Sequence, residues 1–338
     1  MKQLWIKVLF PFLGILILIL DAKTAIAGAT EGLQLCLQVL IPTLFPFFIF
    51  SILLTGALGA TKLPAKNGCF FIGLLGGYPT GAKSISDSLR SGQINREEAK
   101  WLLSFCNNAG PSLIFGIGMV LFDDLLACFS LWIIHIMSAL MVGCLTPKIS
   151  KTKSNSSSKE FPSVSVAMKQ AIVTMTTVCG WVILFRTLQT VLGRWIFWFL
   201  PKTLQIILIG FLELSNGCCM LIEIGPKGLQ FILFSAFLGF GGFCVTMQTV
   251  SVLSANRISI RHYLPSKMAH SALSCLLASA VQRFLFPTQF YALQPSIIAI
   301  LFFIIGIYAL LSQKHKISVA FQRRMMYNSS VKTVTSKR

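Results

Sequence analysis

Polar residues interrupt apolar stretches of this 338-residue sequence at three places. The first is FIGLLGGYPTGAK, residues 71–83, where Gly76, Gly77, Pro79 and Gly81 oppose a straight helix and Lys83 follows at once. Such a break exposes backbone N–H groups, and amides at a helix start favour anions, as does the helix dipole. Anion binding is one interpretation, and a glycine-lined packing turn with Lys83 reaching the lipid headgroups is the other. The candidate substrate-binding residues are Gly76, Gly77, Tyr78, Thr80, Gly81 and Lys83.

The second cluster is SFCNNAGPSLIFG, in which Asn107 and Asn108 lie inside an apolar run and Gly110 and Pro111 follow. Two adjacent amides in hydrocarbon are costly unless their hydrogen bonds are satisfied. The two asparagines therefore either bind substrate or a coupling cation, or they cap a broken helix. We include both among the candidate substrate-binding residues.

The third cluster is FLELSNG, where Glu213 follows a long apolar run and precedes Ser215 and Asn216. A carboxylate inside a membrane segment is a functional hypothesis by default, as a proton carrier or as a cation ligand. The alternative is a structural pairing with Arg186, which lies in the apolar stretch VILFRTLQTVL. Arg186 could instead bind an anionic substrate group, or extend its guanidinium to the membrane surface. Glu213, Ser215, Asn216 and Arg186 complete the predicted site.

The remaining chemistry-bearing residues predict neither a metal nor another cofactor. His135 and His270 are single histidines without metal-ligand spacing, and we expect structural roles for them. Gln248, Asn256 and Lys267 are weaker polar candidates in the second half. The ten cysteines form no Cys-x-x-Cys pair, so we expect small buried apolar residues. No Walker A loop, G-x-S-x-G elbow or H-E-x-x-H helix occurs, and we expect a protein that is not an enzyme.

Composition indicates that these clusters lie in a membrane. Hydrophobic residues make up 55% of the chain and charged residues 12%, whereas soluble domains carry about 25% charged residues. The formal net charge of +19 is spread between apolar segments and over the tail, which is typical of membrane anchoring and of contact with anionic lipid. Nucleic acid is not an expected partner.

The pattern of apolar runs predicts an all-α, polytopic helical membrane protein with about eight transmembrane helices, because about 20 apolar residues span a bilayer. The expected crossings are residues 4–20, 33–59, 101–122, 125–146, 168–192, 228–253, 268–286 and 293–312. Pro42 and Pro46 should kink the second crossing. The first could alternatively be a signal peptide cleaved near Ala27. Two interrupted segments, residues 68–82 and 203–222, predict re-entrant or broken helices that line a cavity.

Charge predicts the topology and the division of the chain. The lysine-rich, serine-rich linker 147–163 and the basic tail 313–338 should be cytoplasmic, and so should both termini, with the loops at 21–31 and 123–124 on the other side. The domains are then an N-terminal helix (1–30), a first half (31–146), the linker, a second half (164–312) and the tail. The two halves would form an inverted repeat, the common plan of secondary transporters, with Gly76-Gly77-Tyr78 echoed by Gly241-Gly242-Phe243.

Four stretches together resemble the YlbJ (SpoVV) sporulation integral membrane proteins, which belong with the nucleoside-recognition (Gate) domain group. They are GLLGGYPTGAK, REEAKWLLSFCNNAGP, LIPTLFPFFIFS and LELSNG, and the likeness covers residues 31–286. The resemblance implies transport of dipicolinic acid, a small aromatic dianion, from the mother cell across the outer forespore membrane during endospore formation. It assigns no residue roles.

The Gate-type resemblance also leaves a nucleoside or another small metabolite open as the transported substrate. A further alternative is a non-transporting assembly protein of the spore envelope that recruits factors through its basic tail. We expect the protein in the bacterial cell membrane or the outer forespore membrane.

Overall fold

The computed structural model describes residues 2–60, 65–146, 162–254, 256 and 258–288. Within these ranges the chain is helical and contains no strand, so the prediction of an all-α polytopic membrane protein is confirmed. The predicted linker 147–163 lies almost wholly outside the described residues, and the predicted crossing 293–312 and the tail lie entirely outside them.

The first half contains α1 (Lys2–Leu20), α2 (Ala22–Leu35), the π-helical segment η1 (Cys36–Leu40), α3 (Ile41–Ala60), α4 (Ala65–Gly76), α5 (Thr80–Arg90), α6 (Arg96–Cys106), α7 (Pro111–Phe122) and α8 (Leu125–Leu145). The second contains α9 (Val164–Trp195), the 3₁₀ turn η2 (Phe197–Phe199), α10 (Lys202–Leu212), α11 (Leu214–Met220), the 3₁₀ turn η3 (Leu221–Glu223), α12 (Lys227–Phe240), α13 (Gly242–Ser254) and α14 (Tyr263–Leu285).

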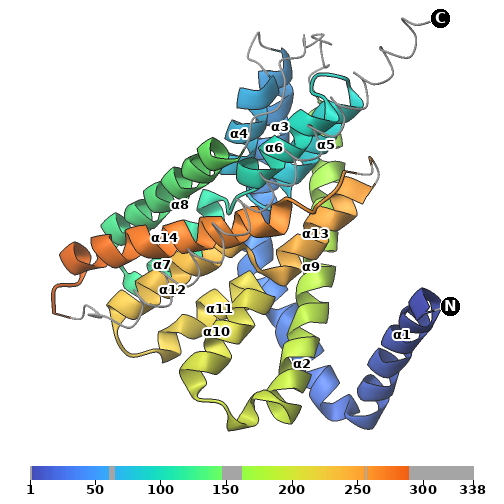
Figure 1. Cartoon of the computed structure of the whole chain (residues 1–338), viewed down its shortest axis with the longest axis vertical. Coiled ribbons are helices and arrows are strands. Elements are labelled where there is room, and N and C mark those ends of the chain that lie inside the picture. The colour runs from blue at the N-terminus through green and yellow to red at the C-terminus, as the bar shows by residue number, and fades with distance from the viewer. Residues whose placement is uncertain (1, 61–64, 147–161, 255, 257, 289–338) are drawn as a thin grey trace, which may run out of the picture.

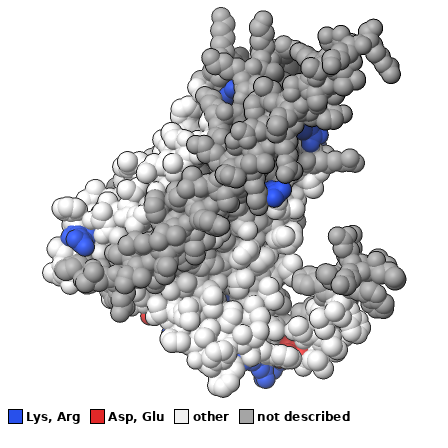
Figure 2. Space-filling model, viewed as in Figure 1, with Lys and Arg blue, Asp and Glu red and all other residues white. Residues whose placement is uncertain are grey.

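Five helical stretches of the described chain are long and apolar enough to cross a membrane: Ala22–Leu54, Arg96–Phe122, Leu125–Leu145, Val164–Trp195 and Lys227–Ser254. Two other predicted crossings, 4–20 and 268–286, form the helices α1 and α14, which are not among these five. The total of eight crossings stays a prediction. Figure 2 shows that only isolated charged atoms interrupt the described surface on one face, as expected for a surface that contacts lipid.

Both segments predicted to be broken are broken. Gly77 to Pro79 separate α4 from α5, and Glu213 separates α10 from α11. Two of the predicted crossings are broken as well. Residues 107–110 interrupt 101–122, which bears out the broken-helix alternative for the asparagines, and Gly241 interrupts 228–253. Gly241 and Gly242 have φ angles of +82° and +80°, a conformation that ends a helix and that glycine adopts without strain.

The second crossing is irregular where proline was expected to disturb it. The π-helical turn η1 ends two residues before Pro42, whose missing N–H and bulky ring oppose regular α-helical bonding upstream. The loop predicted at 21–31 is wrong, because the alanine-rich stretch from Ala22 onward forms helix α2. The turn at Asp123-Asp124 is confirmed: Asp123 is left-handed (φ 47°) and the Asp124 side chain accepts a hydrogen bond from Leu126 N.

The two halves share one order of elements. In each, a long helix (α3 or α9) precedes two broken pairs and one straight helix (α8 or α14). The broken pairs are α4–α5 and α6–α7 in the first half, and α10–α11 and α12–α13 in the second. This order agrees with the predicted repeat, but Gly76-Gly77 lies in a first broken pair and Gly241-Gly242 in a second. The two glycine motifs are therefore not equivalent positions.

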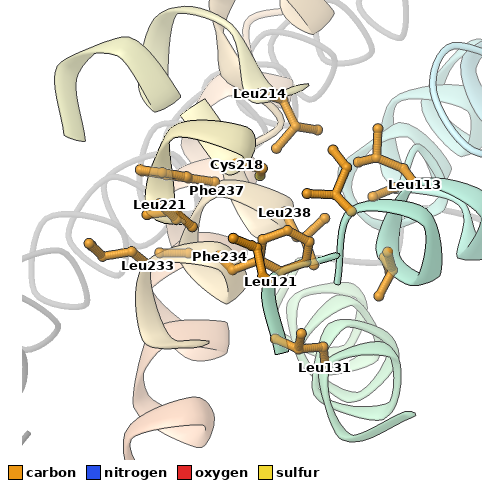
Figure 3. Close-up of a cluster of buried hydrophobic side chains, with 14 of the residues drawn as sticks. Leu113, Leu121, Leu131, Leu214, Cys218, Leu221, Leu233, Phe234, Phe237 and Leu238 are labelled. Atoms are coloured by element: carbon orange, nitrogen blue, oxygen red, sulfur yellow. The ribbon is translucent and has the colours of Figure 1, made fainter. Parts of the chain in front are cut away.

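Figure 1 shows α2 and α9 running side by side, α14 lying along α8 and α12, and α1 standing apart. Close packing of α12 on α14 depends on small residues, since a Cβ added at Gly239 would lie 2.7 Å from Ser271 Cα. Ser271 Oγ also donates to Ala236 O at 2.8 Å. Figure 3 shows the apolar core beside this pair, where Leu113 of α7, Leu214 of α11 and Phe237 of α12 gather.

Candidate functional site

All four helix breaks supply residues to one small cavity, or lie directly beside it. Its volume is about 40 Å³, which is room for a few water molecules. The first three breaks contribute Gly77 and Tyr78, Ala109 and Gly110, and Glu213 with Leu214 and Ser215. Val245 and Gln248 follow the fourth break on α13. The rest of the wall is aliphatic: Leu40, Leu44, Leu113, Val178 and Val182.

The first two breaks touch through glycine backbone. A Cβ added at Gly77, whose φ is +70°, would lie 2.9 Å from Gly110 N and 3.1 Å from Gly110 Cα. Gly73 and Gly81 approach the Cys106 carbonyl so closely that a Cβ on either would lie less than 2.5 Å from its oxygen. The glycines of GLLGGYPTGAK therefore let α4 and α5 pack against the α6–α7 break, besides allowing the turn itself.

Asn107 ties the two halves of the chain together. Its Oδ1 accepts from Ala82 N at 3.2 Å, and its Nδ2 donates to Thr249 Oγ1 and to Tyr263 Oη, both at 2.9 Å. The residue is fully buried, so these bonds satisfy an amide that would otherwise be costly in this interior. Asn108 is also fully buried, but its Nδ2 bonds only locally, to Phe105 O, and its Oδ1 has no partner in the described part of the chain.

Glu213 begins α11 and lines the cavity. It is 2% exposed, and its two oxygens accept from Ser215 N at 3.0 Å and from Asn216 N at 2.6 Å. Charge-assisted bonds from backbone amides stabilise a carboxylate at a helix start. Asn216 in turn donates to Gln189 Oε1 on α9. Among the residues that line the cavity, Glu213 is the one with a charged side chain.

A second buried polar cluster lies behind the cavity wall. Lys267 on α14 is fully buried; its Nζ donates to Asn107 O at 2.8 Å, lies 3.2 Å from His270 Nδ1, and stands 5.1 Å from the centre of the Tyr78 ring. His270 stacks on His135, with ring centres 4.6 Å apart. His135 Nε2 accepts from Ala109 N at 3.1 Å. Tyr78 Oη donates to Leu238 O at 3.1 Å.

The comparison with curated proteins finds a relative. This chain is 25% identical to the sporulation integral membrane protein YlbJ of Bacillus subtilis (strain 168), over 73% of this chain and 74% of that protein. The chain is a YlbJ-type integral membrane protein. No family model matches it, and no solved structure does. The resemblance inferred from its motifs is thus confirmed for the YlbJ type, and the site can be described as that of a YlbJ-type protein.

The residues predicted for the YlbJ-type site fall into three groups. Gly77, Tyr78, Glu213 and Ser215 line the cavity. A second group adjoins it as packing or hydrogen-bonding support: Gly76, Thr80, Gly81, Asn107, Asn108 and Asn216. Lys83 and Arg186 are not among the lining residues.

The two predicted cations contact other partners. Lys83 Nζ donates to Gln170 Oε1 on α9 at 3.3 Å. Arg186 forms an ion pair with Glu31 of α2, with NH2 at 2.6 Å from Oε2, so the alternative of a structural pair with Glu213 is wrong. This pairing is partly exposed, and through it Arg186 holds α9 to α2 rather than forming an ion pair with Glu213.

Four residues that sequence reasoning gave little weight belong to this region. Gln248 lines the cavity, and Lys267, His135 and His270 form the cluster behind it. Among the described residues no group of three or more His, Cys, Asp or Glu could hold a metal ion. Seven cysteines are buried as expected, Cys179 and Cys219 are half-buried, and Cys144 is exposed, which the expectation of ten buried residues missed.

Proposed function

We propose that this YlbJ-type protein is a transporter that moves dipicolinate across the outer forespore membrane by alternating access, with the cavity as the binding site. The observation that carries the proposal is the meeting of four helix breaks around one cavity. Non-helical backbone at membrane depth survives only where protein buries it or where it lines a cavity. Paired discontinuous helices around a central site are the plan of many secondary transporters.

The repeated order of elements supports transport rather than a scaffold role. Alternating access in such proteins works by movement of one repeat against the other around a fixed site. Here the bonds from Asn107 to Thr249 and Tyr263 join the α6–α7 break to α13 and α14, across the two halves. A scaffold has no need for four breaks that converge inside the molecule.

Dipicolinate as the cargo rests on the family resemblance, and the relative's name as a sporulation membrane protein is consistent with it. Tyr78 offers the cavity an aromatic face, and Ser215 and Gln248 offer polar groups. Small-molecule sites usually occupy about 300–1,000 Å³. The cavity of about 40 Å³ is therefore too small for the cargo, and it must widen by separation of the broken helices before the cargo enters.

A neutral metabolite such as a nucleoside is the second candidate, and the lining itself favours it. No lysine or arginine is among the described residues that line the cavity, and the polar groups there are Tyr78, Ser215, Gln248 and the carboxylate of Glu213. An anion that entered this form of the site would approach Glu213 without a cation on the cavity wall. Transport of dipicolinate therefore needs a cation close to the wall or brought to it on opening.

The deciding experiment is uptake of labelled dipicolinate into vesicles that contain only this protein, with protein-free vesicles as the control. The proposal expects saturable uptake that unlabelled dipicolinate inhibits and uridine does not. Inhibition by uridine alone would select the nucleoside alternative. Absence of uptake of either compound would reject transport and leave the assembly role. Deletion of residues 313–338 tests that role in spores, because it should abolish the function of an assembly protein and leave that of a transporter largely intact.

The same vesicles can test whether Lys83 is the cation that reaches the cargo when the cavity opens. Lys83→Ala should lower dipicolinate uptake at least tenfold while the protein still reaches the membrane. Lys202→Ala is the matched control, because Lys202 pairs with Glu223 on the exposed surface, and it should leave uptake unchanged. Normal uptake by Lys83→Ala would remove Lys83 from the site.

A further inference from the structure

Lys267 is a fully buried lysine that has no acidic partner. None of the ion pairs in the described part of the chain involves it. Its Nζ contacts a backbone carbonyl, Asn107 O, and an imidazole nitrogen, His270 Nδ1. A buried ammonium is costly without a counter-ion, and such ionisable residues inside membrane proteins mark ion and proton pathways.

The surrounding hydrogen bonds fix where the protons lie. His270 Nε2 lies 3.0 Å from His135 O, which can only accept, so His270 carries its proton on Nε2 and turns the lone pair of Nδ1 toward Lys267. His135 Nε2 accepts from the Ala109 amide, so the proton of His135 is on Nδ1. His135 is therefore neutral. A lysine ammonium can only donate, so while Lys267 holds its proton His270 is neutral and Lys267 is the donor to both of its acceptors.

Two acceptors need only two of the three hydrogens of an ammonium group. A neutral amine has two N–H bonds and can keep both contacts, so Lys267 can lose one proton without losing either anchor. In the charged form, the Tyr78 ring stabilises the ammonium group by a cation–π interaction, since its centre lies 5.1 Å from Nζ. A lysine held in this way can exist in either protonation state within one local structure.

The cluster adjoins the cavity on two sides. Tyr78, the ring beside Lys267, lines the cavity, and so does Ala109, whose amide is bonded to His135. The other titratable groups nearby are the hydroxyls of Tyr78 and Tyr263 and the thiol of Cys106, and none of these groups can carry a positive charge. Among the described residues, Lys267 is thus the one group next to this part of the wall that can bring a positive charge to an anionic cargo.

From this arrangement we infer that Lys267 is a proton-binding site that couples cargo movement to proton movement. The inference rests on the proposed transport function. With its proton bound, Lys267 attracts an anion to the cavity through the thin wall of Tyr78 and Ala109, and without it the attraction is lost. Because binding linkage is reciprocal, anion binding must also raise the proton occupancy of Lys267. Anion and proton then cross together.

The first test uses the unmodified protein. Dipicolinate is added to purified protein in weakly buffered detergent solution that contains a pH indicator, over a series of starting pH values. The inference expects net proton uptake on binding at some pH, and no such uptake in Lys267→Arg, which keeps its charge. Dipicolinate binding without proton uptake by the unmodified protein at any pH would overturn the inference, whether or not the variants fold.

The second test separates coupling from transport. In vesicles, an inward proton gradient should raise dipicolinate accumulation several-fold with the unmodified protein. Lys267→Arg should keep exchange of labelled for unlabelled dipicolinate and lose the response to the gradient, whereas Lys202→Arg should keep both. Exchange with no gradient response in the unmodified protein would reject coupling and leave transport standing. Absence of exchange in the unmodified protein would reject the transport function itself.

Discussion

Substitution of Gly77 by alanine tests whether the first two helix breaks meet through backbone. The change adds one methyl group at a residue with φ +70°, and that methyl would lie 2.9 Å from Gly110 N. A left-handed non-glycine residue costs about 1–2 kcal/mol. Overpacking of a tight contact adds about 1–3 kcal/mol. The total is about 2–5 kcal/mol of lost stability.

Gly92 provides a matched control in the same half of the chain. Its φ is +71°, nearly that of Gly77, but a Cβ added there meets nothing within 4 Å. Gly92→Ala should therefore show the backbone cost alone, about 1–2 kcal/mol. The difference between the two variants isolates the contact with Gly110, which we expect to be worth about 1–3 kcal/mol.

Thermal unfolding of the purified variants in detergent, followed by intrinsic tryptophan fluorescence, measures this difference. At roughly 2 °C per kcal/mol for a chain of this size, Gly77→Ala should unfold about 2–6 °C below Gly92→Ala. Heating rates are kept equal, because unfolding of such proteins is often irreversible. Equal midpoints for the two variants would refute the reasoning, since they would mean that Gly110 does not approach Gly77.

Three further substitutions test separate parts of the site. Asn107→Ala removes bonds to Ala82, Thr249 and Tyr263 and should cost about 2–4 kcal/mol, well above Asn108→Ala, which loses one local bond; equal unfolding midpoints would contradict this. Glu213→Gln replaces an acceptor of two backbone amides and should lower the stability of the fold by about 0.5–2 kcal/mol. Glu223→Gln should cost almost no stability, because the pair of Glu223 with Lys202 is exposed. Thermal unfolding compares the two variants. Arg186→Gln should cost under about 1 kcal/mol and leave dipicolinate uptake unchanged, because its partner is the half-exposed Glu31; loss of uptake would return Arg186 to the site.

The sequence predicted the helix breaks at positions where the local residue types oppose a continuous helix. Glycine and proline at 76–79, and Asn216 and Gly217 in the segment 203–222, predicted two broken helices, and both are present. The break at Gly241 was missed although a pair of adjacent glycines marks it. The apolar residues on both sides made residues 228–253 look like one crossing, and composition does not show that Gly241 and Gly242 adopt positive φ.

The buried cluster could not have been found from one sequence. His135 and His270 lie 135 residues apart and stack only because α8 packs on α14. Lys267 stood at the start of the predicted crossing 268–286, where a lysine usually reaches the membrane surface. The helix begins earlier, at Tyr263, and this places Lys267 one turn inside it, against the α6–α7 break. Such contacts depend on long-range packing that no local pattern encodes.

The most direct test of the account is an experimental structure of the protein in a lipid nanodisc. The account predicts that Gly77, Gly110, Glu213 and Gln248 surround one cavity at a depth covered by the lipid belt, with Lys267 behind its wall. A structure in which the α4–α5 and α10–α11 breaks lie far apart, or in which Glu213 faces bulk water outside the belt, would contradict it.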